Sequence, residues 1–229
     1  MTQLSVHKPV FSSSFTLHHW FIVSCSFSYL LLCGRIAATG HLTYVFLLWN
    51  LFLAFVPYAI SSWLSRSIRA IGNKWILALS LAVWLLFIPN SFYILTDLFH
   101  LRYIRSAPKW FDLLLLLSFA WNGLLFGIVS VRRIEIILHS VSGRRLSFFI
   151  VFVVMWLNAF GIYIGRFLRY NSWDIVARPF SLFSDMLEIL VYPFDNKMEW
   201  GMISCYAVFM TLLYVTVKKL SENFNQVSK

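Results

Sequence analysis

The sequence predicts an all-α integral membrane protein with about six transmembrane helices, and three observations lead to this class. Hydrophobic residues make up 60% of the chain and charged residues only 12%, whereas soluble domains carry about 25% charged residues. Phe occurs 23 times and Trp ten times, more than a small soluble core requires. Long apolar runs fill most of the 229 residues. They leave no room for a separate soluble domain, so residues 1–229 are expected to form a single membrane domain.

Six apolar segments approach the roughly 20 residues that a helix needs to cross the hydrocarbon core. They are expected at about residues 15–34, 42–64, 75–96, 112–131, 146–165 and 199–217. The first is long for the apolar core of a signal peptide, and another apolar run follows after a short turn, so we interpret it as an anchor. Residues 221–229 are polar, and we expect them to form a frayed tail.

The one long loop joins the fifth and sixth predicted helices, over residues 166–198. Its middle, Phe180 to Phe194, is rich in apolar residues but too short to span a bilayer. Two structures remain open for it: an amphipathic helix in the outer interface, or a re-entrant segment.

The distribution of charge predicts the orientation. The N-terminus, the C-terminus and loops 65–74 and 132–145 together carry 11 Lys and Arg residues, whereas the other loops carry eight. Seven of the nine acidic residues lie in the second set. Because basic loops stay on the cytoplasmic side, both termini are expected in the cytoplasm. The net charge of +10 is therefore explained by membrane topology, and we expect the lipid bilayer rather than nucleic acid as a partner.

Two polar stripes interrupt the apolar pattern at the outward ends of the third and fifth helices. If α-helical spacing continues past Pro89, Asn90, Tyr93, Asp97 and His100 fall within an arc of roughly 80°. The same spacing brings a second group onto one arc, with Arg169 beside it; the group is Tyr163, Arg166, Tyr170 and Asp174. Ionisable groups at membrane depth usually face a bundle interior or a wet cavity. The stripes therefore predict a polar pocket on the outer side.

Each stripe has alternative interpretations. Asp97 and His100 are spaced as two metal ligands, or as a base and its orienting partner; alternatively, Asp97 pairs with Arg166 or Arg169 and pins two helices together. The two arginines suit a lipid or polyprenyl phosphate, but they also suit snorkelling to headgroups. No HExxH-type, CxxC or His-rich spacing is present, so no metal site is predicted, and no cofactor is identified.

Three stretches carry a resemblance to a known family: FLLWNLFLAFVP at 46–57, WLLFIPNSFYILTDLFHL at 84–101 and GIYIGRFLRYNSWD at 161–174. With them the chain resembles the bacterial membrane family catalogued as domain of unknown function 1361, over about residues 30–215. The resemblance implies a multi-pass protein of the bacterial cytoplasmic (inner) membrane, without an assigned activity. Its signature positions here are Pro89, Asn90, Tyr93, Thr96, Asp97, His100, Gly165, Arg166, Arg169, Asn171, Trp173 and Asp174.

The leading functional hypothesis is an outward-facing pocket that binds, and acts on, a lipid-linked or anionic headgroup substrate such as a polyprenyl phosphate. In this hypothesis Asp97 and His100 are catalytic. Arg166 and Arg169 hold the anion, and Asp174 orients one of them. The other predicted binding residues are Asn90, Tyr93, Thr96, Asn171 and Trp173. Two alternatives stay open: an assembly subunit whose polar motifs are interhelical latches, and a small transporter. The sequence predicts neither the substrate nor the oligomeric state.

Overall fold

The structure is a computed structural model that describes residues 17–102, 107–170 and 174–227. Every regular element in these ranges is helical. In chain order the elements are α1 (Leu17–Thr39), α2 (Phe46–Arg66), α3 (Ile68–Gly72), α4 (Lys74–Tyr93), the 3₁₀ helix η1 (Ile94–Arg102), α5 (Lys109–Ser142), α6 (Arg144–Arg166), α7 (Asp174–Ala177), α8 (Pro179–Val191) and α9 (Lys197–Val227).

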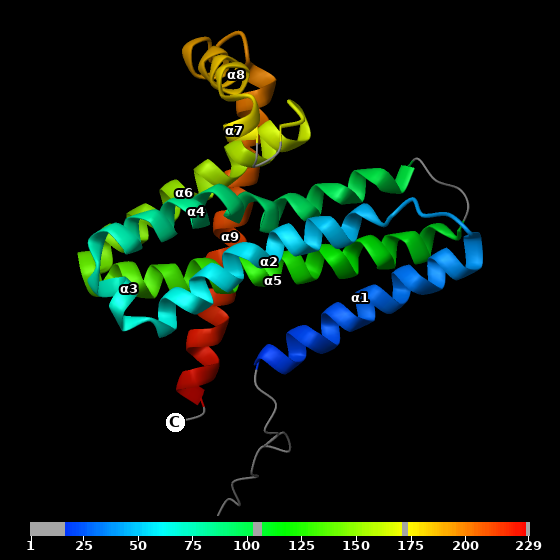
Figure 1. The fold of residues 1–229 in the computed structure, drawn as a ribbon, viewed down its shortest axis with the longest axis horizontal. Coiled ribbons are helices and arrows are strands. Elements are labelled where there is room, and N and C mark those ends of the chain that lie inside the picture. The colour runs from blue at the N-terminus through cyan, green and yellow to red at the C-terminus, as the bar shows by residue number, and fades with distance from the viewer. Residues whose placement is uncertain (1–16, 103–106, 171–173, 228–229) are drawn as a thin grey trace, which may run out of the picture.

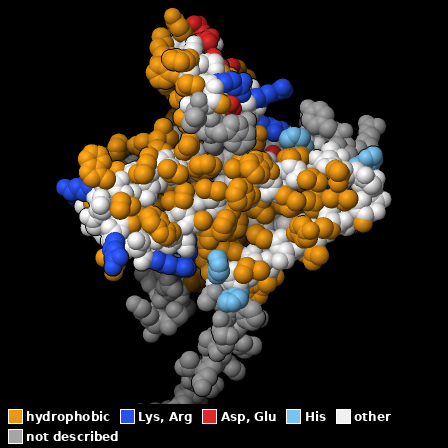
Figure 2. All heavy atoms as spheres, viewed as in Figure 1, with side chains coloured by type: hydrophobic (Ala, Val, Ile, Leu, Met, Phe, Trp, Pro, Cys, Tyr) orange, Lys and Arg blue, Asp and Glu red, His pale blue; other side chains and the backbone are white. Residues whose placement is uncertain are grey.

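Six segments of the described chain are long and apolar enough to cross a membrane, which confirms the predicted fold class. They are Leu17–Thr39, Phe46–Arg66, Lys74–Leu101, Lys109–Val141, Arg145–Arg166 and Lys197–Phe224. The third combines α4 with most of η1. Hydrophobic side chains cover most of the bundle face in Figure 2, and Lys and Arg gather toward its opposite ends. This distribution suits a bundle whose middle lies in hydrocarbon and whose ends reach water.

Consecutive spanning helices run in opposite directions (Figure 1). The start of α1, the short α3, the α5–α6 junction and the C-terminus lie toward one end of the molecule. The α1–α2 turn, the end of η1, the start of α5 and α8 lie toward the other. We call the second the α8 end. Helix α9 crosses the direction shared by α2 and α5 and packs mainly against α6.

Close helix packing occurs where α5 meets α4 and η1. A side chain at Gly123 would collide with Ile94, and one at Gly127 would come within 3.0 Å of Phe92 and Ser91. Small residues of this kind let two backbones approach in membrane bundles. A similar approach joins α6 to α4, because a Cβ at Gly161 would lie 2.8 Å from the Pro89 ring.

Two expectations about helix ends were wrong. The α-helix does not continue through the first polar stripe: α4 ends at Tyr93, and residues 94–102 form a 3₁₀ helix. The residues from Ser221 to Val227 are not a frayed tail but continue α9. The contact of Glu222 with Lys219, at 3.1 Å, lies within this last part of the helix.

The long loop contains the predicted extra helix, which is α8. Leu182 and Ile189 are buried toward the bundle, whereas large apolar side chains on the other faces are exposed; these are Phe180, Phe183, Leu187, Leu190 and Val191. A short helix with an exposed apolar face at the end of a membrane bundle is suited to lying in the interface.

Candidate functional site

A cavity of about 500 Å³ lies between α2, α4 and α6, toward the α8 end of the molecule. Most of its wall is apolar, and α7 and α8 contribute Ile175, Leu182 and Met186. The remaining lining residues are Trp49, Asn50, Leu53, Ala82, Leu85, Leu86, Pro89, Asn90, Tyr93, Leu157, Phe160, Gly161, Ile164, Gly165 and Tyr170. The cavity thus joins parts of all three stretches on which the family resemblance rests.

Two predicted binding residues, Asn90 and Tyr93, line this cavity from the last turns of α4. Both are half-buried, and the Asn90 amide donates a hydrogen bond to the carbonyl of Phe87 at 3.0 Å. Gly165 of α6 faces Tyr93 closely, since a Cβ there would lie 3.3 Å from the ring. The glycine therefore leaves space that a larger residue would take from the cavity.

The predicted catalytic residue Asp97 is 1% exposed and does not line the cavity. Its carboxylate accepts a hydrogen bond from the Asn50 side chain at 2.8 Å, and Asn50 does line the cavity. Asp97 therefore orients an amide of the cavity wall from behind. The change from α to 3₁₀ geometry at Ile94 explains why Asp97 does not face the cavity with Asn90 and Tyr93. At that point the rotation per residue rises from about 100° to about 120°.

His100 and Thr96 also lie on η1, outside the cavity lining. The Thr96 hydroxyl, fully buried, donates to the carbonyl of Tyr93 at 2.7 Å. The His100 ring nitrogen Nδ1 lies 3.2 Å from the backbone oxygen of Asp97, and the ring centroid is 5.0 Å from that of Phe46. The imidazole contacts the backbone of Asp97 and an aromatic ring, which fixes its position at the edge of the bundle.

Arg166 is half-buried at the end of α6, and its guanidinium lies over the Phe99 ring, 5.4 Å from the centroid. Arg169 is exposed and has a φ of 60°, a left-handed conformation uncommon for a residue with a side chain. No ion pair within 4 Å joins Asp97 to either arginine in the described part of the chain.

The last residue of the stretch 161–174, Asp174, is the first residue of α7. Asp174, 3% exposed, accepts a hydrogen bond from Arg178 at 3.1 Å. The Tyr170 hydroxyl, from the cavity wall, donates to Asp185 of α8 at 2.8 Å and so ties α8 to the end of α6. The predicted binding residues Asn171 and Trp173 lie outside the described residues.

Sequence reasoning missed a buried ion pair between α1 and α5. Arg35 Nε donates to Asp112 Oδ1 at 2.7 Å and Nη2 to Oδ2 at 3.3 Å, and both residues are 1% exposed. The Arg35 guanidinium also stacks on Tyr44, 4.4 Å from its ring centroid. Burial and the Asp112 carboxylate raise the pKa of Tyr44 to about 12, so its hydroxyl stays protonated and donates to Asp112.

A second buried cluster, also missed, surrounds Glu135 on α5. Tyr214 and Lys218 of α9 each donate to its carboxylate at 2.6 Å, and Arg132 pairs with it from the preceding turn. The cluster fixes α9 against α5 at the end opposite to α8. Apart from Arg132, the residues that bond to Asp112 and Glu135 lie 68 to 83 residues away from them in the sequence, so no local spacing indicates these contacts.

The cavity combines a mostly apolar wall with a few polar groups. Ligand sites are typically concave and apolar, with a few polar groups that fix the orientation. Here these groups are Asn50, Asn90, Tyr93 and Tyr170. Within the ranges that the structure describes, no three His, Cys, Asp or Glu side chains are placed to hold a metal ion together.

The helices and their apolar surface define a multi-pass membrane protein. The chain belongs to the family described as "Protein of unknown function (DUF1361)", whose sequence profile matches residues 49–214. The match covers the cavity walls from Trp49 onward, together with η1 and α8. No curated protein and no solved structure gives a significant match to the chain.

Proposed function

We propose that the protein binds an amphipathic lipid with an anionic headgroup, such as a polyprenyl phosphate, in the cavity between α2, α4 and α6. The observation that carries the proposal is the cavity itself: about 500 Å³, mostly apolar, with polar groups from all three stretches on which the family resemblance rests. The apolar wall formed by Leu53, Leu85 and Phe160 suits an acyl or prenyl chain. The polar groups Asn90, Tyr93 and Tyr170 then face the headgroup.

The anionic character of the ligand follows from the charges beside the cavity. Gly165 lines the cavity and is followed directly by Arg166, which reaches the end of the bundle. A guanidinium donates hydrogen bonds in a planar fork that matches phosphate oxygens. In this proposal Arg166 and Arg169 hold the headgroup, while Asp97 acts as a positioning residue for Asn50.

The first test removes the positive charge of Arg166 and leaves the residues that line the cavity unchanged. Arg166→Gln is expected to lower retention of an anionic lipid by about tenfold, the order of one lost charged hydrogen bond. Lys197→Gln is the matched control, because Lys197 is an exposed cation at the start of α9, near the same end of the molecule. Lipids extracted from the purified variants and quantified by mass spectrometry give the measurement. Equal retention in all three proteins would contradict the role of Arg166.

The proposed orientation places the cavity toward the outer leaflet of a bacterial inner membrane, with both termini in the cytoplasm. The basic loops 65–74 and 132–145 support this orientation, since Lys and Arg concentrate on the cytoplasmic side. The exposed apolar face of α8 would then rest in the outer interface, over the cavity.

A second candidate function is that of an assembly subunit whose polar motifs only fix helices. The observation that favours it is the Asn50–Asp97 hydrogen bond, which ties α2 to η1 without any ligand. Exchanging these two residues separates the two functions. The exchange keeps a carboxylate–amide pair between α2 and η1, but it moves the carboxylate to position 50, which lines the cavity.

A further inference from the structure

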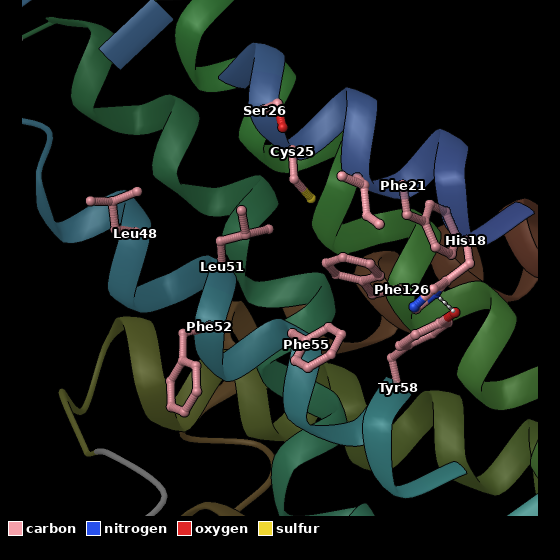
Figure 3. Close-up of a pocket in the computed structure, with 11 residues that line it drawn as sticks. His18, Phe21, Cys25, Ser26, Leu48, Leu51, Phe52, Phe55, Tyr58 and Phe126 are labelled. Carbon is pink, nitrogen blue, oxygen red and sulfur yellow. Dashed lines mark hydrogen bonds between the residues drawn. The ribbon is translucent and has the colours of Figure 1, made fainter. Parts of the chain in front are cut away.

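A second hollow, separate from the cavity, lies between α1 and α2 and has a volume of about 400 Å³. We call it the α1–α2 groove. Figure 3 shows Cys25 of α1 on one side, Leu51 and Phe55 of α2 on the other, and Phe126 of α5 between them. The groove exists because α1 packs against α5 and diverges from α2 toward its N-terminal end. Its wall is almost entirely apolar.

One end of the groove is polar, and the cation of Arg133 lies directly behind it. His18 Nδ1 lies 3.3 Å from the Tyr58 hydroxyl, and both residues line the groove (Figure 3). Arg133 of α5 lies behind them, with its guanidinium 4.5 Å from the Tyr58 ring centroid and Nη2 3.5 Å from the Tyr58 hydroxyl. This end belongs to the side of the bundle that carries α3 and the α5–α6 junction.

Arg133 lacks a counterion within the described ranges of the chain. None of the ion pairs found there includes it, although the adjacent Arg132 pairs with Glu135. Its Nη1 is buried and makes no hydrogen bond to any described residue. A partly buried guanidinium without a carboxylate is costly, and an anion from outside the chain would lower that cost.

The geometry points to the α1–α2 groove as a binding site for an anionic phospholipid. One acyl chain lies along Phe52, Phe55 and Phe126, and the phosphate lies at the end formed by His18, Tyr58 and Arg133. Charge complementarity selects this occupant, because a zwitterionic lipid would bring a cation next to Arg133. The site differs from the cavity of the proposed function in its helices and in the end of the bundle at which its headgroup lies. With the proposed orientation it takes lipid from the cytoplasmic leaflet.

The test uses full-length protein carrying Ala82→Trp, which fills the other cavity so that the groove is measured by itself. Delipidated protein is titrated in detergent with phosphatidylglycerol or with phosphatidylcholine, and bound lipid is counted by native mass spectrometry. Phosphatidylglycerol is expected to bind more tightly, and Arg133→Gln is expected to weaken it by about tenfold. Arg145→Gln, which removes an exposed cation at the start of α6, is expected to leave binding unchanged.

A steric variant keeps the test decisive if Arg133→Gln unfolds. Cys25→Trp fills the groove without altering any charge, and it is expected to abolish binding of phosphatidylglycerol. Three results would overturn the inference: equal affinity for the two lipids, equal weakening by Arg133→Gln and Arg145→Gln, or undiminished binding in Cys25→Trp. Failure of the other cavity to bind lipid would leave these results unaffected, because that cavity is filled in every protein compared.

Discussion

Replacing Arg35 or Asp112 alone with alanine is expected to destabilise the protein by about 3–5 kcal/mol, because each change leaves the other charge buried without its partner. Both side chains are at most 2% exposed, and their two hydrogen bonds hold α1 against α5. The double replacement Arg35→Met with Asp112→Leu leaves no buried charge. It is therefore expected to recover much of the lost stability. Thermal unfolding of the purified proteins in detergent measures the effect.

Lys109→Ala is the control for this experiment. Lys109 is exposed at the first turn of α5, close in sequence to Asp112, and its removal is expected to change stability by less than about 0.5 kcal/mol. If the double replacement instead loses the sum of the two single losses, the pair does not act as a coupled unit, and the proposed reason for the instability is wrong.

The exchange of Asn50 and Asp97 is made as Asn50→Asp together with Asp97→Asn. It is expected to keep the fold and to abolish retention of an anionic lipid in the cavity. Asp97→Asn alone turns a charged hydrogen bond into a neutral amide–amide one, and it is expected to cost about 1 kcal/mol. Adding Asn50→Asp restores an amide–carboxylate pair between α2 and η1, so stability should return. The carboxylate then lies in the cavity wall, where it repels an anionic headgroup. Thermal unfolding and quantified bound lipid are measured on the same preparations, all of which carry Cys25→Trp so that the α1–α2 groove is filled.

The outcomes of the exchange distinguish the two candidate functions. An exchanged protein that is stable and keeps its lipid would show that charge at this wall is immaterial to the ligand. An exchanged protein as unstable as Asp97→Asn would show that the bond is not interchangeable, and the positioning role of Asp97 would fail. Asn90→Asp provides a comparison, because it adds a carboxylate to the same wall without altering the Asn50–Asp97 pair.

The membrane class and the six spans were predictable because they depend on the hydropathy of about 20 residues taken together. A single polar residue barely changes that total. The meeting of the third and fifth helices near Asn90 and Gly165 was also anticipated, since both stripes were predicted at helix ends on the same side of the bundle. The relation of Asp97 to the cavity was not. Nothing in the residue types marks the change from α to 3₁₀ geometry at Ile94, and that change turns Asp97 toward Asn50.

The two buried ion clusters show a different limit. Arg35 was one of the eight basic residues that the sequence analysis counted in the second set of loops, yet it is buried in α1. Its partner Asp112 is 77 residues away, and only the packing of α1 on α5 brings them together. Glu135 had a visible neighbour in Arg132, but Tyr214 and Lys218 belong to the last helix. Periodicity within one helix cannot reveal such pairs.

The central claim, that the cavity between α2, α4 and α6 holds a lipid, is tested most directly by filling it. Ala82 lines the cavity and is exposed, so Ala82→Trp adds bulk there at little cost to packing. Val83 is the next residue, 39% exposed and absent from the lining, and Val83→Trp is the matched control. All proteins in this test carry Cys25→Trp, so that the α1–α2 groove is filled. Native mass spectrometry in mild detergent is expected to find bound anionic lipid when the cavity is unaltered and when Val83→Trp is added, but not when Ala82→Trp is added. Retention of the same lipid with Ala82→Trp, or its absence when the cavity is unaltered, would contradict the proposed function.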